Sequence, residues 1–122
     1  MAGVAKQNRH LRGKLAEWLA FALVVVKGYH VLATNTKGSH AEIDILAQKG
    51  ETLCFIEVKY RHNLEAATLA IHPAQKDRQW QQAMATARRY KHTGPVQFEA
   101  VLVFSHWPFV KHLKNVYGDM QP

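Results

Sequence analysis

Two apolar, strand-like runs joined by a short polar turn constrain the fold of this chain more than any other feature. The runs cover residues 41–47 and 53–60, and the polar residues 48–52 between them include Gly50. Runs of this length separated by a glycine-containing turn are typical of a β-hairpin. We therefore expect residues 41–60 to form two adjacent antiparallel strands.

Charged side chains interrupt these two runs at Asp44, Glu57 and Lys59. Charges in an apolar strand pair are costly unless they are paired or bind an ion. Because strand side chains alternate between faces, Glu57 and Lys59 share a face, and a suitable register places Asp44 beside Glu57. Two carboxylates with a lysine suit a hard divalent cation, Mg²⁺ or Mn²⁺, and phosphodiester hydrolysis. We expect Asp44 and Glu57 to hold the metal, and Lys59 to position the attacking water or stabilise the phosphate charge.

Glu17 is the only charged residue between Leu15 and Val26. A lone carboxylate on an apolar helix needs a partner, and packing of this helix over the sheet could bring Glu17 to the same cation. The alternative is a salt bridge from Glu17 to Lys14 or Lys59.

The apolar stretch that contains Glu17 has 12 residues, Leu15–Val26. A membrane-spanning helix needs about 20 apolar residues. We therefore expect a buried helix here and no association with a membrane.

The composition fits one compact domain with a basic surface. The chain has 122 residues, 48% of them hydrophobic, and 16 basic against 9 acidic residues give a net charge of +7. A charge of this size favours a polyanionic partner, most often nucleic acid, although a basic protein without such a partner remains the alternative. Cys54 is the single cysteine, so no internal disulfide can form, which suits a reducing cytoplasm.

Local patterns predict a basic, mobile arm over residues 1–10 and a single domain over 11–122. Polar loops are expected at 34–40 and 61–72. The regular elements expected in the domain are a helix over 11–27 ended by Gly28, strands over 29–33, 41–47, 53–60, 97–104 and 109–114, and a helix between Pro73 and Gly94. The helical connection before the fourth strand permits a parallel crossover. This order, α-β-β-β-α-β with an added edge strand, predicts an α/β fold with a mixed central sheet flanked by helices.

The helix after Pro73 carries an apolar stripe at helical spacing. Its predicted core face contains Trp80, Ala83, Met84 and Ala87, whereas Gln82 falls off the stripe. Lys76 lies on the same stripe near the helix start, so we expect it to face the sheet and a bound phosphate.

Basic residues near the proposed site are candidates for nucleic-acid contact. They are Lys37, Arg61, Lys76, Arg78, Arg88 and Arg89. Contacts of such side chains with phosphates would be independent of sequence and sensitive to salt. The alternative for Arg88 and Arg89 is a solvated helix face.

Several short motifs, taken in order and spacing, resemble one protein family. They are Gly13-x3-Glu17-x2-Ala20, Gly28-Tyr29-x-Val31-Leu32-Ala33-x-Asn35, Glu42-Ile43-Asp44-Ile45, Phe55-Ile56-Glu57-Val58-Lys59-Tyr60-Arg61, Pro73-x2-Lys76 and Asn115-Val116-Tyr117. In this order they are similar to the YraN-like family of uncharacterised bacterial proteins, which is related in fold to archaeal Holliday-junction resolvases. Within them, Asp44-x12-Glu57-x-Lys59 resembles the PD-(D/E)-x-K nuclease core.

This resemblance implies a restriction-endonuclease-like αβββαβ core. It implies Asp44 and Glu57 as metal ligands, Lys59 as the catalytic lysine, and Glu17 as the helix acid that helps to hold the metal. Resolvases of this fold act as two-fold dimers, so the resemblance also suggests a homodimer. The chain departs from the family where Ala16 and Ala41 replace glycines and where Gln97-Phe98-Glu99 replaces Arg-Phe-Asp, but the core carboxylates and lysine are retained.

Three functional hypotheses follow from the sequence. The first is a metal-dependent endonuclease that hydrolyses DNA, with branched or damaged DNA among the candidate substrates. The second is a non-catalytic nucleic-acid-binding module of the same fold. The third is a structural or partner-binding protein that uses the edge strand at 109–114.

Overall fold

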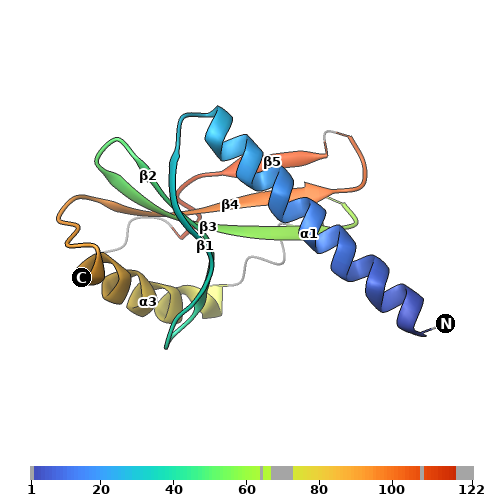
Figure 1. The fold of residues 1–122 in the computed structure, drawn as a ribbon, viewed down its shortest axis with the longest axis horizontal. Helices are drawn as coiled ribbons and strands as arrows, with labels where there is room; N and C mark the ends of the chain where they lie inside the picture. The colour runs from blue at the N-terminus through green and yellow to red at the C-terminus, as the bar shows by residue number, and fades with distance from the viewer. Residues whose placement is uncertain (1, 64, 67–72, 108, 118–122) are drawn as a thin grey trace.

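The computed structural model describes residues 2–63, 65–66, 73–107 and 109–117 (Figure 1). In chain order the elements are α1 (Ala2–Val26), β1 (His30–Lys37), β2 (Glu42–Lys49), β3 (Thr52–Arg61), η1 (Pro73–Gln75), α3 (Lys76–Arg89), β4 (Val96–Phe104) and β5 (Val110–Leu113). The five strands form one sheet in the order β1-β2-β3-β4-β5. β3 and β4 are parallel and the other neighbours antiparallel, so the predicted mixed α/β sheet with its αβββαβ order is confirmed and is consistent with a restriction-endonuclease-like core.

The β2–β3 hairpin forms where the sequence predicts it. Its register pairs Ile45 with Ile56 and Lys49 with Thr52, which leaves a two-residue turn. Gly50 opens this turn with a φ of 59°, a value that glycine adopts without strain.

The two helices cover opposite faces of the sheet. α1 packs on a core that includes Ile45, Cys54 and Ile56, whereas α3 packs on a core that includes Leu46 and Phe55. These residues alternate along β2 and β3, as the pleat of a strand requires. Cys54 is a buried core residue on the α1 side, as expected.

The end of α1 confirms the role predicted for Gly28. The backbone N–H of Gly28 donates to the carbonyl of Val25, and that of Tyr29 donates to the carbonyl of Val24. Gly28 has a φ of 92°, so this is a Schellman motif, which satisfies the last carbonyls of the helix.

Two predictions about α1 differ from the structure. The helix begins at Ala2, so residues 2–10, expected to be a mobile arm, are helical, and in Figure 1 the first turns extend past the sheet. The apolar stretch was expected to be buried, but only one side of it is. The small residues Ala16, Ala20 and Val24 face the sheet, whereas Trp18 is 71% exposed. Among the described residues, no helix has the length and apolar character that a bilayer span requires.

Three boundaries also shift. β1 continues to Lys37, so most of the loop predicted at 34–40 is strand, because this segment pairs with β2 from Glu42 onward. A short 3-10 helix at Pro73–Gln75 precedes α3, which ends at Arg89 rather than near Gly94. Most of the loop predicted at 61–72 lies outside the described residues.

Candidate functional site

Asp44 lies where β2 separates from β3. The ladder between the two strands ends at the pair Ile45 and Ile56, and the next pair in the same register would be Asp44 and Glu57. Instead of a backbone carbonyl, the Oδ2 atom of Asp44 accepts the N–H of Val58, at 2.8 Å. The carboxylate therefore holds the end of the hairpin together and lies beside the strand that carries Glu57.

Glu57 and Lys59 occupy the face of β3 that the strand alternation predicts. They lie on the side of Phe55, which packs with the α3 core, and opposite Ile56. Lys59 Nζ is 2.9 Å from Glu57 Oε1, and the two side chains are 23% and 20% exposed. The lysine thus supplies the positive charge that offsets a half-buried carboxylate.

A pocket of about 330 Å³ joins these side chains. Asp44, Glu57 and Lys59 all line it, together with Arg78 from α3 and Tyr117 from the segment after β5. Glu42 and Glu99 line it as well, so six charged side chains from three strands and a helix converge on one cavity, and this is the arrangement expected of a site for a charged ligand.

The electrostatics of the pocket act on Asp44. The pKa of Asp44 is raised from 3.8 to about 6. Burial is the largest cause, the hydrogen bond from the Val58 N–H opposes it, and the negative charges of Glu57, Glu17 and Glu42 add to the rise. Ionised Asp44 is therefore in an unfavourable environment at neutral pH unless a positive charge binds beside it.

Glu17 approaches this site from the other face of the sheet. It lines one pocket with Asp44 and a second pocket with Lys59, both on the α1 side. Among the described residues, no salt bridge joins Glu17 to Lys14 or Lys59, the partners considered as the alternative. Its part in metal binding stays a prediction.

The donor set of the site fits a hard divalent cation with few protein ligands. Asp44 and Glu57 offer two carboxylates to one pocket, and Mg²⁺ is commonly held by one or two carboxylates and several waters. In the part of the chain that the structure describes, no group of three or more His, Cys, Asp or Glu side chains is arranged to hold a metal ion. Metal binding by Asp44 and Glu57 therefore stays a prediction.

The predicted nucleic-acid contacts are spread over the molecule. Arg78 lines the site pocket, and Arg61 lines the neighbouring pocket with Lys59. The remaining candidates line none of the three pockets described, and they are Lys37 at the end of β1, Lys76 at the start of α3, and Arg88 and Arg89 in its last turn. Cations in a last helical turn also stabilise the helix dipole, so Arg88 and Arg89 have a structural role available to them.

Gln82 is a site-supporting residue that the sequence analysis placed on the wrong face of α3. It is 4% exposed, and its Oε1 accepts the backbone N–H of His40 at 3.0 Å and of Ala41 at 3.3 Å. Gln82 thereby fixes the loop that leads into β2 and Asp44. A Cβ at Gly38 would overlap the Gln82 amide, so this glycine allows the close approach.

Glu99 is a second buried group that the sequence analysis left without a role. It is 1% exposed on β4 and accepts hydrogen bonds from Tyr29 at 2.9 Å and Gln97 at 3.0 Å. The His112 ring on β5 also contacts its carboxylate. Burial raises the pKa of Glu99, but the bonds from His112, Cys54 and Tyr29 outweigh burial and hold the pKa below its usual value. This network ties β4 to α1's end and to β5.

Comparison with known proteins identifies a family that covers most of the chain. The chain matches the model of Uncharacterised protein family UPF0102 over residues 16–103. A UPF0102 protein of Methylorubrum populi is 37% identical over 115 residues, which are 92% of this chain and 90% of the relative. A UPF0102 protein of Maricaulis maris is 36% identical over 118 residues, covering 94% and 93% of the two chains. The chain therefore belongs to Uncharacterised protein family UPF0102, which is the YraN family that its motifs resemble.

Proposed function

We propose that this protein is a divalent-metal-dependent endonuclease that hydrolyses phosphodiester bonds of DNA. The observation that carries the proposal is the convergence of Asp44, Glu57 and Lys59, from two adjacent strands, on one pocket. The raised pKa of Asp44 supports it, because a bound cation would relieve the repulsion between the carboxylates.

Asp44 and Glu57 would hold the cation, with Glu17 assisting from α1. When bound, Mg²⁺ or Mn²⁺ polarises the scissile phosphate and lowers the pKa of the attacking water. Glu57 would exchange its lysine partner for the metal. Lys59, freed from Glu57, would donate a hydrogen bond to the phosphate and stabilise the negative charge that develops on it.

Arg78 would bind the phosphate from the α3 side, since it lines the same pocket. An arginine donates several N–H groups in a fixed plane and suits a phosphate oxygen pair. The net charge of +7 supports a polyanionic substrate and predicts affinity that falls steeply with salt.

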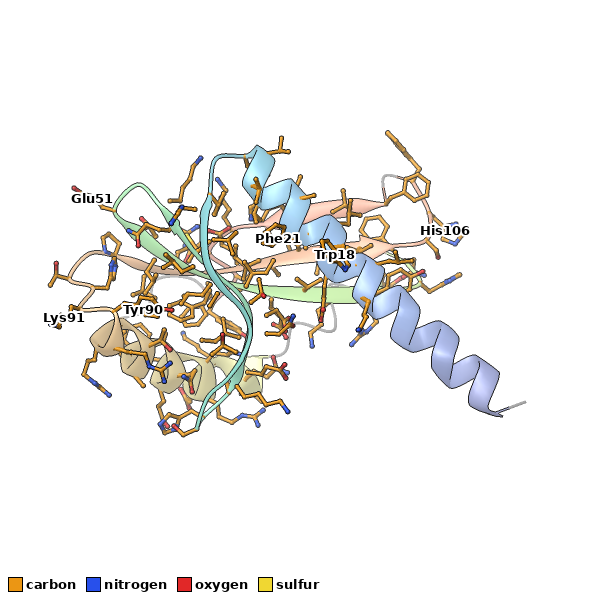
Figure 2. The ribbon with its side chains drawn as sticks, viewed as in Figure 1. Trp18, Phe21, Glu51, Tyr90, Lys91 and His106 are labelled. Atoms are coloured by element: carbon orange, nitrogen blue, oxygen red, sulfur yellow. The ribbon has the colours of Figure 1, made fainter. Side chains whose placement is uncertain are left out.

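The test is cleavage of end-labelled four-way-junction, flap, single-stranded and duplex DNA, and of single-stranded RNA, with Mn²⁺. Wild type is compared with Glu57→Gln and with the control Glu51→Gln, whose side chain is exposed in the β2–β3 turn (Figure 2). Cleavage by wild type and the control, but not by Glu57→Gln, supports the proposal and ranks the substrates.

The opposite result would favour the second hypothesis. If purified wild type cleaves none of the substrates but binds DNA in a salt-sensitive way, the protein is a nucleic-acid-binding module. If it neither cleaves nor binds, a structural or partner-binding role, including a homodimer, becomes the leading account.

A further inference from the structure

A second pocket lies on the α1 side of the sheet, next to the proposed metal site. Its volume is about 290 Å³. Trp18 and Phe21, both on α1, form its apolar wall, and Figure 2 shows the two side chains on the same stretch of the helix. Lys14 and Glu17 also line the pocket and carry opposite charges. The pocket thus combines aromatic surface with a few polar groups, as small-ligand sites do.

Trp18 is not needed to hold α1 on the sheet. The helix is seated by the small residues Ala16 and Ala20, which are 2% and 0% exposed. Trp18 is 71% exposed and Phe21 is 37% exposed, so both rings keep free aromatic surface. Other apolar side chains of α1 are exposed as well, namely Leu15, Leu19, Val25 and Val26, but Trp18 and Phe21 are the ones that line the pocket. Exposed apolar surface at a pocket marks an interaction site.

Two polar residues of β1 also line the pocket. They are Thr34 and Asn35. Asn35 has a φ of 50°, an uncommon backbone conformation that asparagine tolerates better than most residues. Hydroxyl and amide groups of this kind can donate to and accept from the edge of a flat heterocycle.

This pocket and the pocket of the proposed metal site share one lining residue, Asp44, although they lie on opposite faces of the sheet. A flat group held by Trp18 would therefore keep whatever is covalently attached to it close to the carboxylate that the metal needs.

We propose that this pocket binds an unpaired nucleobase, stacked on Trp18 and adjacent to the phosphate that is cleaved. The inference rests on the proposed function in taking the ligand to be a nucleic acid. A base inside a duplex is stacked on its neighbours and does not reach such a pocket, so the protein selects single-stranded, flipped or junction nucleotides. The basic surface attracts the strand. The aromatic side chains then stack on a base that is not already stacked within a duplex.

Binding without cleavage tests this inference separately from the proposed function. The probes are fluorescent oligo(dT), the same oligonucleotide with abasic positions, and a blunt duplex of equal charge, all in EDTA. The proteins are wild type, Trp18→Ala, Trp18→Phe and the control Trp107→Ala, in which an 83% exposed tryptophan outside this pocket is removed. Circular dichroism and urea unfolding confirm that each variant is folded.

Trp18→Ala is expected to weaken binding of oligo(dT) by about fivefold to a hundredfold, the range for one stacked base. Trp18→Phe should recover much of this loss, and Trp107→Ala should bind as wild type does. Binding of the abasic strand and of the duplex should not change. An oligonucleotide with 2-aminopurine should lose fluorescence on wild type through stacking, and much less on Trp18→Ala.

Other results would overturn the inference. If Trp18→Ala loses affinity equally for all three probes, Trp18 contacts the nucleic acid without stacking on a base. If it loses no affinity for any probe, Trp18 does not take part in binding. If Trp18→Ala instead dissociates a wild-type dimer in sedimentation, the exposed face of α1 is an interface between two copies. Loss of oligo(dT) binding in a protein that cuts no DNA would support the pocket while rejecting the nuclease.

Discussion

The carboxylate of Asp44 accepts the backbone N–H of Val58 at 2.8 Å, at the point where β2 and β3 part. The Asp44 side chain thus links β2 to β3 at the open end of the hairpin, and it is also a proposed ligand of the metal. Closing the hairpin requires only an acceptor, which a neutral amide also provides. Binding a cation requires the charge, and the two roles can therefore be separated by substitution.

Asp44→Asn is expected to stabilise the protein without metal at pH 7.5 by about 1–2 kcal/mol. The full rise of the Asp44 pKa from 3.8 to about 6 corresponds to an upper bound of about 3 kcal/mol, and partial exposure of the site reduces it. The amide oxygen still accepts the Val58 N–H, whereas the repulsion among carboxylates disappears. Urea unfolding with EDTA measures the difference, and Glu51→Gln in the exposed β2–β3 turn is the control.

The difference in stability between wild type and Asp44→Asn should also depend on pH. The unfolded chain loses the Asp44 proton near pH 3.8 and the folded protein near pH 6, so the folded state binds more protons between these values. The stability of wild type relative to Asp44→Asn should therefore fall as pH rises through this window. If Asp44→Asn is less stable than wild type at pH 7.5, the negative charge of Asp44 is needed for its hydrogen bond with the Val58 N–H.

Lys59→Gln is expected to lower cleavage without lowering metal affinity. Lys59 is paired with Glu57 at 2.9 Å and so competes with the cation for this carboxylate. Its removal should leave the Kd for Mn²⁺ unchanged or smaller, measured by calorimetry. Single-turnover cleavage should fall by about 10²–10³, as for the loss of one donor to a transition-state oxyanion. Weaker Mn²⁺ binding would mean that Lys59 serves to orient Glu57.

Local signals in the sequence are sufficient for much of the fold. The two apolar runs around Gly50 predict the hairpin, and Gly28 predicts the end of α1, because both depend on residues close together in the chain. The alternation along β3 likewise predicts that Glu57 and Lys59 share a face. These features can be predicted without knowing which distant residues pack on them.

The features that sequence reasoning missed depend on tertiary contacts. Gln82 is polar and was expected at the surface, but its amide replaces water for the backbone of His40 and Ala41. Apart from Glu17, helix α1 is apolar on every side between Leu15 and Val26, so its composition does not say which side the sheet covers. Glu99 meets His112 only because β5 folds back beside β4.

Gly38→Ala and Gln82→Ala are expected to be non-additive. A methyl group at Gly38 meets the Gln82 amide, which is held by His40, Ala41 and Thr86 and cannot move without losing those bonds. Each single variant should lose about 1–3 kcal/mol of unfolding free energy. The double variant should lose clearly less than the sum, because truncation of Gln82 removes the clash. Additive losses in urea unfolding would show that the two residues do not touch.

Glu99→Gln is expected to destabilise the protein by about 2 kcal/mol at pH 7, because the buried bonds with His112 and Tyr29 lose their charged acceptor. The pKa of Glu99 lies below its usual value of 4.5, so its stabilising effect is complete above that pH and is lost as pH falls through the lower, folded pKa. The difference between wild type and Glu99→Gln should therefore shrink on acidification below pH 4.5. The exposed Glu51→Gln is the matched control in urea unfolding at each pH. A difference that stays constant down to pH 3 would show that Glu99 acts through its shape and packing, since the loss would then be independent of its charge.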